Sequence, residues 1–169
     1  MNTFDAILKR RSIRKFKDTK VSDEITKKLL VSAMAAPSAR NAQPWEFYVV
    51  TNEEKILEIR NIAKNFDFNS HLLIIVCGNK TRTITQNDND FWMQDCAAAV
   101  ENILLQATEE GLGTVWCGLF PVIERAEKVK ETLNMPNEII PMALLHVGYP
   151  DEEKEERSQY KEEYIHYVK

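Results

Sequence analysis

The chain has 169 residues, 44% of them hydrophobic and 28% charged, which fits one ordinary globular domain and excludes a disordered or fibrous protein. The net charge of −4 argues against a general nucleic-acid binder, and three widely spaced cysteines argue against a disulfide framework or a zinc site. Residues 1–17 lack the apolar core of a signal peptide, and the longest apolar run, residues 72–77, is too short to span a bilayer. We therefore expect a cytoplasmic protein that does not enter a membrane.

Two helices separated by a basic stretch are predicted at the start of the chain. Thr3 caps the first helix, whose inward face would consist of Phe4, Ile7 and Leu8. Residues 9–17 then hold six basic side chains and no acid. Ser22 caps the second helix, which must end before Pro37 and whose inward face would consist of Ile25, Leu29, Leu30, Ala33 and Met34.

Strand and helix signals alternate in the middle of the chain. Residues 45–50 favour a strand, and Asn52 caps a helix whose inward residues would be Ile56, Ile59, Ala63 and Phe66. The apolar run at residues 72–77 is typical of a strand covered on both faces. Residues 80–89 are polar and without periodicity, which predicts a loop that could act as a lid.

The longest helix is predicted from near Asp90 to Gly111, followed by a short strand over residues 113–117. Pro121 opens another helix, with Val122, Ala126, Val129 and Leu133 at helical spacing. The last strand covers residues 139–147, and Pro141 places its beginning at an edge or a bulge. Because strict βαβ alternation is missing, we expect one α+β layered domain with a single sheet covered by helices.

Three arginines and a serine lie within five residues near the N-terminus, at Arg10, Arg11, Ser12 and Arg14. A guanidinium grips phosphate with two parallel hydrogen bonds, and a hydroxyl adds a further donor, so this segment could hold a phosphate group. A solvated basic face and a nucleic-acid patch are the alternatives. The acidic remainder of the chain argues against the nucleic-acid patch.

A second polar stretch, residues 37–47, lies between two prolines and a strand. It contains Ser38, Arg40, Asn41 and Gln43, and the two amide side chains each offer donors and an acceptor on one planar head. Such groups suit a planar ligand edge that carries both N–H and C=O. A polar surface turn that caps itself is the alternative for this stretch taken alone.

The glycine-rich segment at residues 111–118 contains GxG but no third glycine, and it follows a helix and precedes a strand. This order is the reverse of a dinucleotide fingerprint, so a Rossmann fold is excluded. His71, His146 and His166 are scattered, and no Ser/His/Asp order or paired carboxylates occur. If the protein is an enzyme, a cofactor should supply its reactivity.

Four segments, taken in order, resemble the FMN-dependent nitroreductase family: residues 10–14, 37–45, 111–118 and 141–150. The resemblance covers almost the whole chain. It implies a nitroreductase-like layered fold over residues 1–169, with a mostly antiparallel central sheet in an entwined homodimer. Residues 151–169, a charged linker followed by an apolar and aromatic tail, would then form a C-terminal extension that packs on the partner subunit.

The same resemblance implies bound FMN, with NADH or NADPH as the hydride donor and a small molecule such as a nitroaromatic or quinone as the acceptor. No side chain would be catalytic, since the flavin carries the chemistry. Arg14 would lie near the pyrimidine edge of the flavin, while Ser38, Asn41 and Gln43 would come from the other subunit. The full set of implied cofactor-binding residues is Arg10, Arg11, Ser12, Arg14, Pro37, Ser38, Ala39, Asn41, Gln43, Cys117, Gly118, Leu119, Lys154 and Arg157.

Two other functions stay open on the sequence. The first is a flavin-binding or flavin-processing protein of the same fold without nitroreductase turnover, because a fold does not fix a function. The second is a non-catalytic nucleic-acid binder that uses residues 9–17. Neither the natural acceptor nor the preference for NADH or NADPH is encoded in a recognisable motif.

Overall fold

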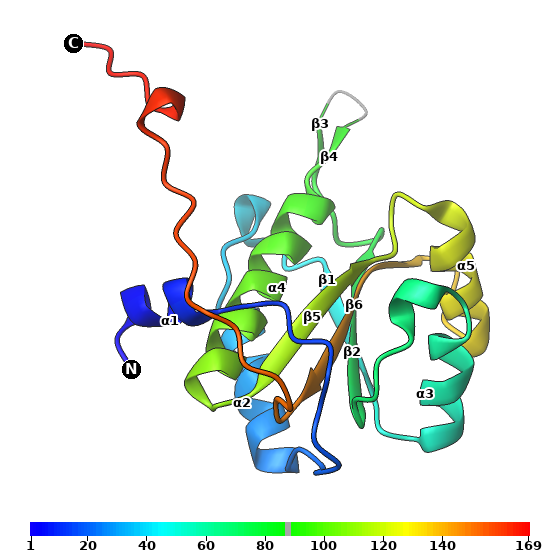
Figure 1. Cartoon of the computed structure of the whole chain (residues 1–169). Coiled ribbons are helices and arrows are strands. Elements are labelled where there is room, and N and C mark those ends of the chain that lie inside the picture. The colour runs from blue at the N-terminus through cyan, green and yellow to red at the C-terminus, as the bar shows by residue number, and fades with distance from the viewer. Residues whose placement is uncertain (87–88) are drawn as a thin grey trace.

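The computed structural model describes residues 1–86 and 89–169, and a four-stranded sheet with the order β1-β2-β6-β5 lies at its centre (Figure 1). The strands are β1 (Trp45–Val50), β2 (Leu72–Asn79), β5 (Gly113–Gly118) and β6 (Ile139–Gly148). Every neighbouring pair is antiparallel. The predicted α+β class and the mostly antiparallel sheet are therefore confirmed.

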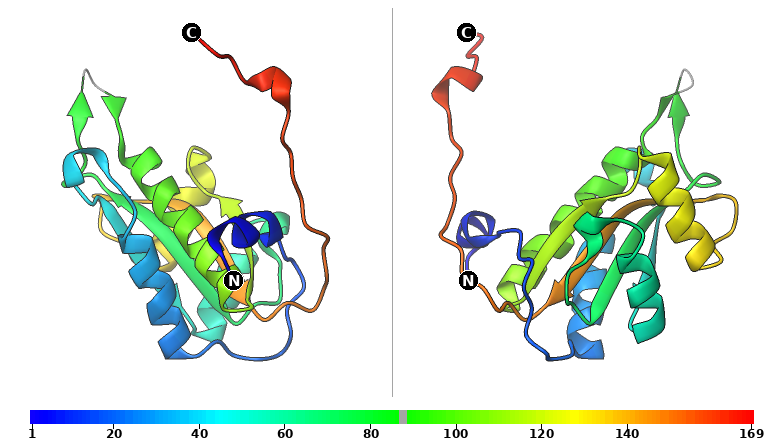
Figure 2. Two further views of the ribbon diagram at one scale, coloured as in Figure 1. Left: turned by 90° about the vertical axis from the view of Figure 1, so that its left-hand side faces the viewer. Right: turned by 45° about the vertical axis from the view of Figure 1, so that its right-hand side comes forward.

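Helices cover both faces of this sheet. Helices α2 (Asp23–Met34) and α4 (Trp92–Glu109) lie on one face, and α3 (Glu53–Arg60) and α5 (Ile123–Thr132) lie on the other (Figures 1 and 2). The short helix α1 (Thr3–Lys9) lies against α4. None of the helices that the structure describes is long and apolar enough to cross a membrane.

The central strand β2 shows why residues 72–77 form an unbroken apolar run. Leu72, Ile74 and Val76 belong to the apolar cluster beneath α2 and α4, whereas Leu73, Ile75 and Cys77 belong to the cluster beneath α3 and α5. Side chains alternate between the two faces of a strand, so a strand covered on both faces must be apolar at every position. The prediction for this strand is confirmed.

The predicted inward face of the first helix is wrong within this chain. Ala6 is the buried residue of α1, whereas Phe4 is 67% exposed and Ile7 49% exposed. The cap is also one residue earlier than expected, because the side chain of Asn2 accepts the backbone N–H of Asp5. Contact through a small alanine leaves the large apolar side chains of α1 on the surface. Met34 of α2, predicted inward, is likewise 52% exposed.

Three other predictions are refined. Residues 80–89 contain a short hairpin of β3 (Thr85–Gln86) and β4 (Asn89–Asp90), although part of the expected loop, residues 87–88, lies outside the described residues. Helix α5 begins at Ile123 with Val122 as its cap, so Pro121 precedes the helix. Pro141 lies on the inner strand β6, and a register shift opposite Val76 and Cys77 confirms the bulge.

Residues 151–169, termed the arm, leave the end of β6 and extend away from the body of the protein (Figures 1 and 2). The arm contacts the body only over its first part, where the backbone N–H of Arg157 donates to the Leu8 carbonyl at 3.2 Å, as far as the described residues show. Farther out, Tyr164, Tyr167 and Val168 are 71, 75 and 99% exposed. The arm thus presents an apolar and aromatic end that its own domain does not cover.

One buried polar pair lies beneath α3 and α5. His146 on β6 is fully buried, and its Nδ1 lies 2.7 Å from the hydroxyl of Ser70. Burial lowers the pKa of His146 from 6.5 to about 3, with the Arg60 charge adding to this effect. A histidine this reluctant to accept a proton is a poor general base, so the Ser70–His146 pair is a structural contact and not a nucleophile and its base.

Candidate functional site

The basic segment, residues 10–14, lies along the free edge of the sheet. Ser12 forms a parallel bridge with Thr114 of β5, and the Ile13 backbone N–H donates to the Thr114 carbonyl at 2.8 Å. Ile13 is 7% exposed and anchors the segment in the core, as does Phe16 two residues beyond its end. These two buried side chains fix the backbone that carries Arg10, Ser12 and Arg14.

Gly113 permits this close approach of two chain segments. A Cβ atom on Gly113 would lie 2.7 Å from the Ile13 Cβ and 2.8 Å from both of its γ carbons. Non-bonded carbon atoms prefer separations of about 3.5–4 Å, so a side chain at residue 113 cannot coexist with Ile13 in its present place. Gly113, which was predicted to begin the strand, therefore also sets where the basic segment lies.

The three arginines have different surroundings. Arg10 Nε lies 3.5 Å from Glu101 of α4, and burial raises the pKa of the Glu101 carboxyl while Arg10 partly offsets that rise. Arg11 Nη1 donates to the Glu155 carbonyl of the arm. Within residues 1–86 and 89–169, the Arg14 guanidinium has neither an ion pair nor a hydrogen bond. Of these three arginines, Arg14 is therefore the one most available to a ligand.

Arg11 lines a cavity whose lining does not include Arg10 or Arg14. Arg11, Ile13 and Lys154 line a cavity of about 700 Å³ between the basic segment, the start of the arm and the end of α4. Three glutamates line the same cavity, at Glu152, Glu153 and Glu156. The three glutamates balance the charges of Lys9, Arg11 and Lys154 in the same lining, so these side chains give the cavity no net positive charge to attract a phosphate.

The start of the arm holds the backbone of the basic segment. Glu152 Oε1 accepts the backbone N–H of Arg14 at 2.5 Å and that of Lys15 at 3.3 Å, and the Arg14 N–H lowers the pKa of the Glu152 carboxyl. Lys154 Nζ donates to the Ser12 carbonyl at 2.7 Å and lies 3.4 Å from Glu152. Lys154 is thus already engaged with the backbone of Ser12.

Backbone groups at the end of β5 face the free edge of the sheet. The Thr114 carbonyl points outward to Ile13, and backbone groups alternate sides along a strand, so the N–H and C=O groups of Trp116 and Gly118 point outward too. Trp116 is 39% exposed. A Cβ atom on Gly118 would meet nothing within 4 Å, so the face of the strand is open at this residue.

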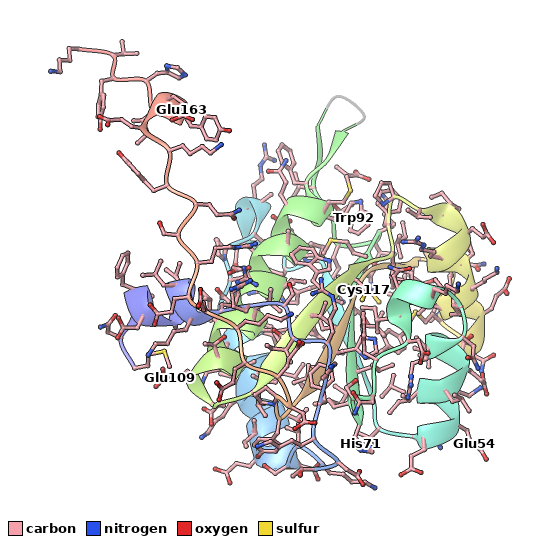
Figure 3. All side chains as sticks on the ribbon, in the orientation of Figure 1. Glu54, His71, Trp92, Glu109, Cys117 and Glu163 are labelled. Atoms are coloured by element: carbon pink, nitrogen blue, oxygen red, sulfur yellow. The ribbon has the colours of Figure 1, made fainter. Side chains whose placement is uncertain are left out.

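Cys117 and Leu119 point into the protein. The Cys117 thiol lies 3.4 Å from the Asn65 carbonyl, and burial raises its pKa to about 11 despite the nearby charges of Arg14 and Arg125. The thiol therefore stays protonated at neutral pH and is not a nucleophile. Leu119 is fully buried, and its backbone N–H donates to Met142. Figure 3 shows Cys117 within the body, whereas Glu163 lies out on the arm.

The polar loop, residues 37–44, has an unusual backbone. Arg40, Asn41 and Gln43 have φ values of 50°, 56° and 48°, in the left-handed region that side chains disfavour. Gln43 Nε2 donates to Asn41 Oδ1 at 3.1 Å, so the two amide heads are tied together on the surface. Among the described residues, the Asn41 Nδ2 donors and the Gln43 Oε1 acceptor have no other partner and can recognise a ligand edge.

The polar loop and the basic segment do not converge within one chain. The loop is held at Asp95 of α4, whose Oδ1 accepts the Ala39 N–H, while Arg10 is held at Glu101 of the same helix. Six helical residues correspond to about 9 Å of rise and a rotation of roughly 120° about the axis. The two predicted halves therefore lie on different sides of α4.

Asp95, Glu101 and Glu152 are structural partners of the site that the sequence interpretation missed. Glu101 and Glu152 lie far in sequence from the segment they hold, and no motif marks them. Asp95 could have been noticed in the sequence, because it is the one acidic residue in the first turn of α4. A lone acid on a buried helix face indicates a specific hydrogen-bond partner.

Solved structures share this fold, in which two helical layers cover a four-stranded sheet. One from Clostridium acetobutylicum has a TM-score of 0.90 and 40% identity and covers 98% of this chain and 99% of that chain. An FMN-dependent nitroreductase from Clostridium difficile R20291 has a TM-score of 0.87 and 31% identity, with coverage of 98% and 99%.

The sequence comparison agrees with the fold. The Nitroreductase family profile matches residues 7–66 and 60–149, and the chain belongs to the nitroreductase family. A relative from Archaeoglobus fulgidus is 40% identical over 154 residues, and the match covers 88% of this chain and 86% of the relative. The name of that relative places it among NADH dehydrogenases and NAD(P)H nitroreductases. The family resemblance of the four sequence motifs is confirmed.

Proposed function

We propose that the protein is an FMN-dependent oxidoreductase that takes hydride from NADH or NADPH and passes it to an acceptor such as a nitroaromatic or a quinone. The observation that carries the proposal is the arginine segment held against the free edge of β5, with Arg14 unpaired among the described residues. The FMN-dependent nitroreductase of Clostridium difficile, which has this fold, supports the choice of cofactor.

The residues present fit FMN. Arg10 and Ser12 offer a guanidinium and a hydroxyl for the phosphate end, and Gly118 offers outward backbone groups next to open space for a planar ring. Arg14 supplies a fixed positive charge for the ring edge on which negative charge gathers. Lys154 and Arg157 remain the arm's candidates for a phosphate contact, although Lys154 already donates to Ser12.

Each side chain has a defined task in this mechanism. Arg10 and Ser12 would bind the phosphate, Arg14 would stabilise charge at the ring, and the Gly118 N–H would be available to the ring edge. Asn41 and Gln43 would recognise the donors and acceptors of that edge and so orient it. When bound, FMN supplies the hydride-accepting and hydride-donating chemistry that these side chains lack.

We further propose a homodimer in which the polar loop of one subunit completes the site of the other. Two observations support it: the two halves of the site lie on different sides of α4, and apolar side chains are exposed on the arm and on α1 and α2. The arm would pack on the partner subunit. Sedimentation should show a dimer of the flavin-loaded protein, and a flavin-loaded monomer would contradict the proposal.

Arg10→Ala is expected to raise the Kd for FMN about tenfold, which corresponds to about 1.4 kcal/mol, because a charge-assisted phosphate contact is lost. The melting temperature of the FMN-free protein should barely change, since the Arg10–Glu101 pair is partly solvated. Titration of FMN fluorescence measures the Kd. Lys17→Ala, an exposed basic residue beyond the motif, is the control and should bind FMN like the wild type.

A flavin-binding protein without reductase turnover is the second candidate function. It is favoured by the same site, because none of the residues assigned to FMN binding distinguishes storage or processing of flavin from electron transfer through it. Bound flavin that neither NADH nor NADPH reduces would establish this second function in place of the first.

A further inference from the structure

Asp95 is a buried carboxyl group of α4 that faces the polar loop. Its side chain is 6% exposed, and Oδ1 accepts the backbone N–H of Ala39 at 2.9 Å. Its Oδ2 is buried and has no hydrogen-bond partner among the described residues. Burying a carboxyl group is costly, so a carboxyl group at this position calls for a specific role.

The polar loop needs external support. Arg40, Asn41 and Gln43 all have left-handed backbone conformations, which persist only where the surroundings hold them. Hydrogen bonds within the loop fix its shape, since Gln43 N donates to Ser38 Oγ at 3.0 Å and Asn41 N donates to the Ser38 carbonyl at 2.9 Å. These bonds connect the loop to itself and do not place it on the body.

Arg82 holds the other end of the same loop. Its Nε donates to the Gln43 carbonyl at 3.3 Å, its Nη2 donates to the Trp45 carbonyl at 2.9 Å, and its Nη1 lies 3.1 Å from Glu46 Oε1. A guanidinium presents its donors in a rigid fork, so one side chain fixes three acceptors at once. The strained residues 40–43 thus lie between one anchor at Ala39 and another at Gln43 and Trp45.

We propose that Asp95 and Arg82 are positioning residues for flavin binding: together they hold the polar loop so that the amides of Asn41 and Gln43 are already oriented when the ring edge arrives. This inference rests on the proposed function. Neither residue contacts the ligand in this scheme. Because they order the loop before FMN binds, the free energy of binding is not reduced by the entropy of ordering the loop.

The test combines hydrogen exchange of the FMN-free protein with FMN titration. Asp95→Ala should speed amide exchange over residues 38–43 at least tenfold and raise the Kd for FMN about tenfold. Asp95→Asn should restore both toward wild type, because its amide oxygen still accepts the Ala39 N–H. The matched control is Asn102→Ala, which removes a hydrogen bond from α4 to Ser32 and should leave loop exchange and the Kd unchanged.

Arg82→Met provides a second test that leaves α4 intact, and it should also speed exchange over residues 38–43 and weaken FMN binding. Unchanged loop exchange in both Asp95→Ala and Arg82→Met would overturn the proposal. The proposal would also be overturned if Asp95→Asn restored the loop's protection from exchange but left the Kd for FMN as weak as in Asp95→Ala. If the wild type binds no FMN, the proposed function fails. The exchange data would still show whether Asp95 and Arg82 hold the loop.

Discussion

Acidification from pH 6.5 to pH 3 is expected to lower the free energy of unfolding by about 4 kcal/mol through His146 alone. The imidazole is fully buried, and burial lowers its pKa from 6.5 to about 3. In this interval the histidine binds a proton in the unfolded chain but stays neutral in the native chain. The free energy of unfolding therefore falls as the pH falls. Well above pH 6.5 both states are neutral at this residue, and its contribution no longer depends on pH.

Urea unfolding at several pH values measures this effect, with His146→Gln as the comparison. Glutamine can keep a hydrogen bond to Ser70 and does not titrate, while the carboxyl groups titrate equally in both proteins. Between pH 6 and pH 4 the wild type should lose about 1.4 kcal/mol per pH unit more than the variant does. The two proteins are compared at one concentration without FMN. Parallel curves would show that His146 is not buried in the neutral form.

Gly113→Ala is expected to lower the free energy of unfolding by about 3 kcal/mol, at the upper end of typical overpacking costs. The added Cβ would meet three carbon atoms of Ile13 at 2.7–2.8 Å. Ile13 cannot simply turn away, because its own Cβ is one of these atoms and its backbone N–H is bonded to Thr114. The basic segment must therefore shift, and FMN binding should weaken more than tenfold.

Thermal unfolding without FMN and FMN titration measure the two effects of Gly113→Ala separately. Gly118→Ala on the same strand is the control for stability, because its Cβ would meet nothing within 4 Å and its φ is not positive. It should change the free energy of unfolding by less than about 0.5 kcal/mol. Equal stability of the two variants would contradict the close approach of Ile13 to Gly113.

Local rules predicted most of the layered fold. The caps at Ser22 and Asn52 accept N–H groups as expected, and the apolar run at residues 72–77 is a strand buried on both faces. The same rules were wrong for Phe4, Ile7 and Met34, which are apolar at helical spacing yet exposed in one chain. Periodicity reports that a face is apolar but not which surface covers it.

The candidate site was only partly accessible from the sequence. Arg10 and Ser12 have donors that suit a phosphate, and Ser12 pairs with Thr114 of β5, while their phosphate contact stays a prediction. Arg11 belongs to the same motif, but the structure turns it toward a cavity lined by glutamates. Asp95 and Arg82 could not be predicted, because their role depends on backbone acceptors and donors that only the folded loop brings near them.

Anaerobic reduction of the FMN-loaded protein tests the central claim most directly. The purified protein, reconstituted with FMN and freed of excess cofactor, is mixed with NADH or NADPH while its visible flavin absorption is followed. We expect the yellow colour to bleach with at least one of the two nicotinamides and to return when a quinone or a nitroaromatic is added. A protein that retains no FMN, or whose bound FMN neither nicotinamide bleaches, would contradict the proposed oxidoreductase.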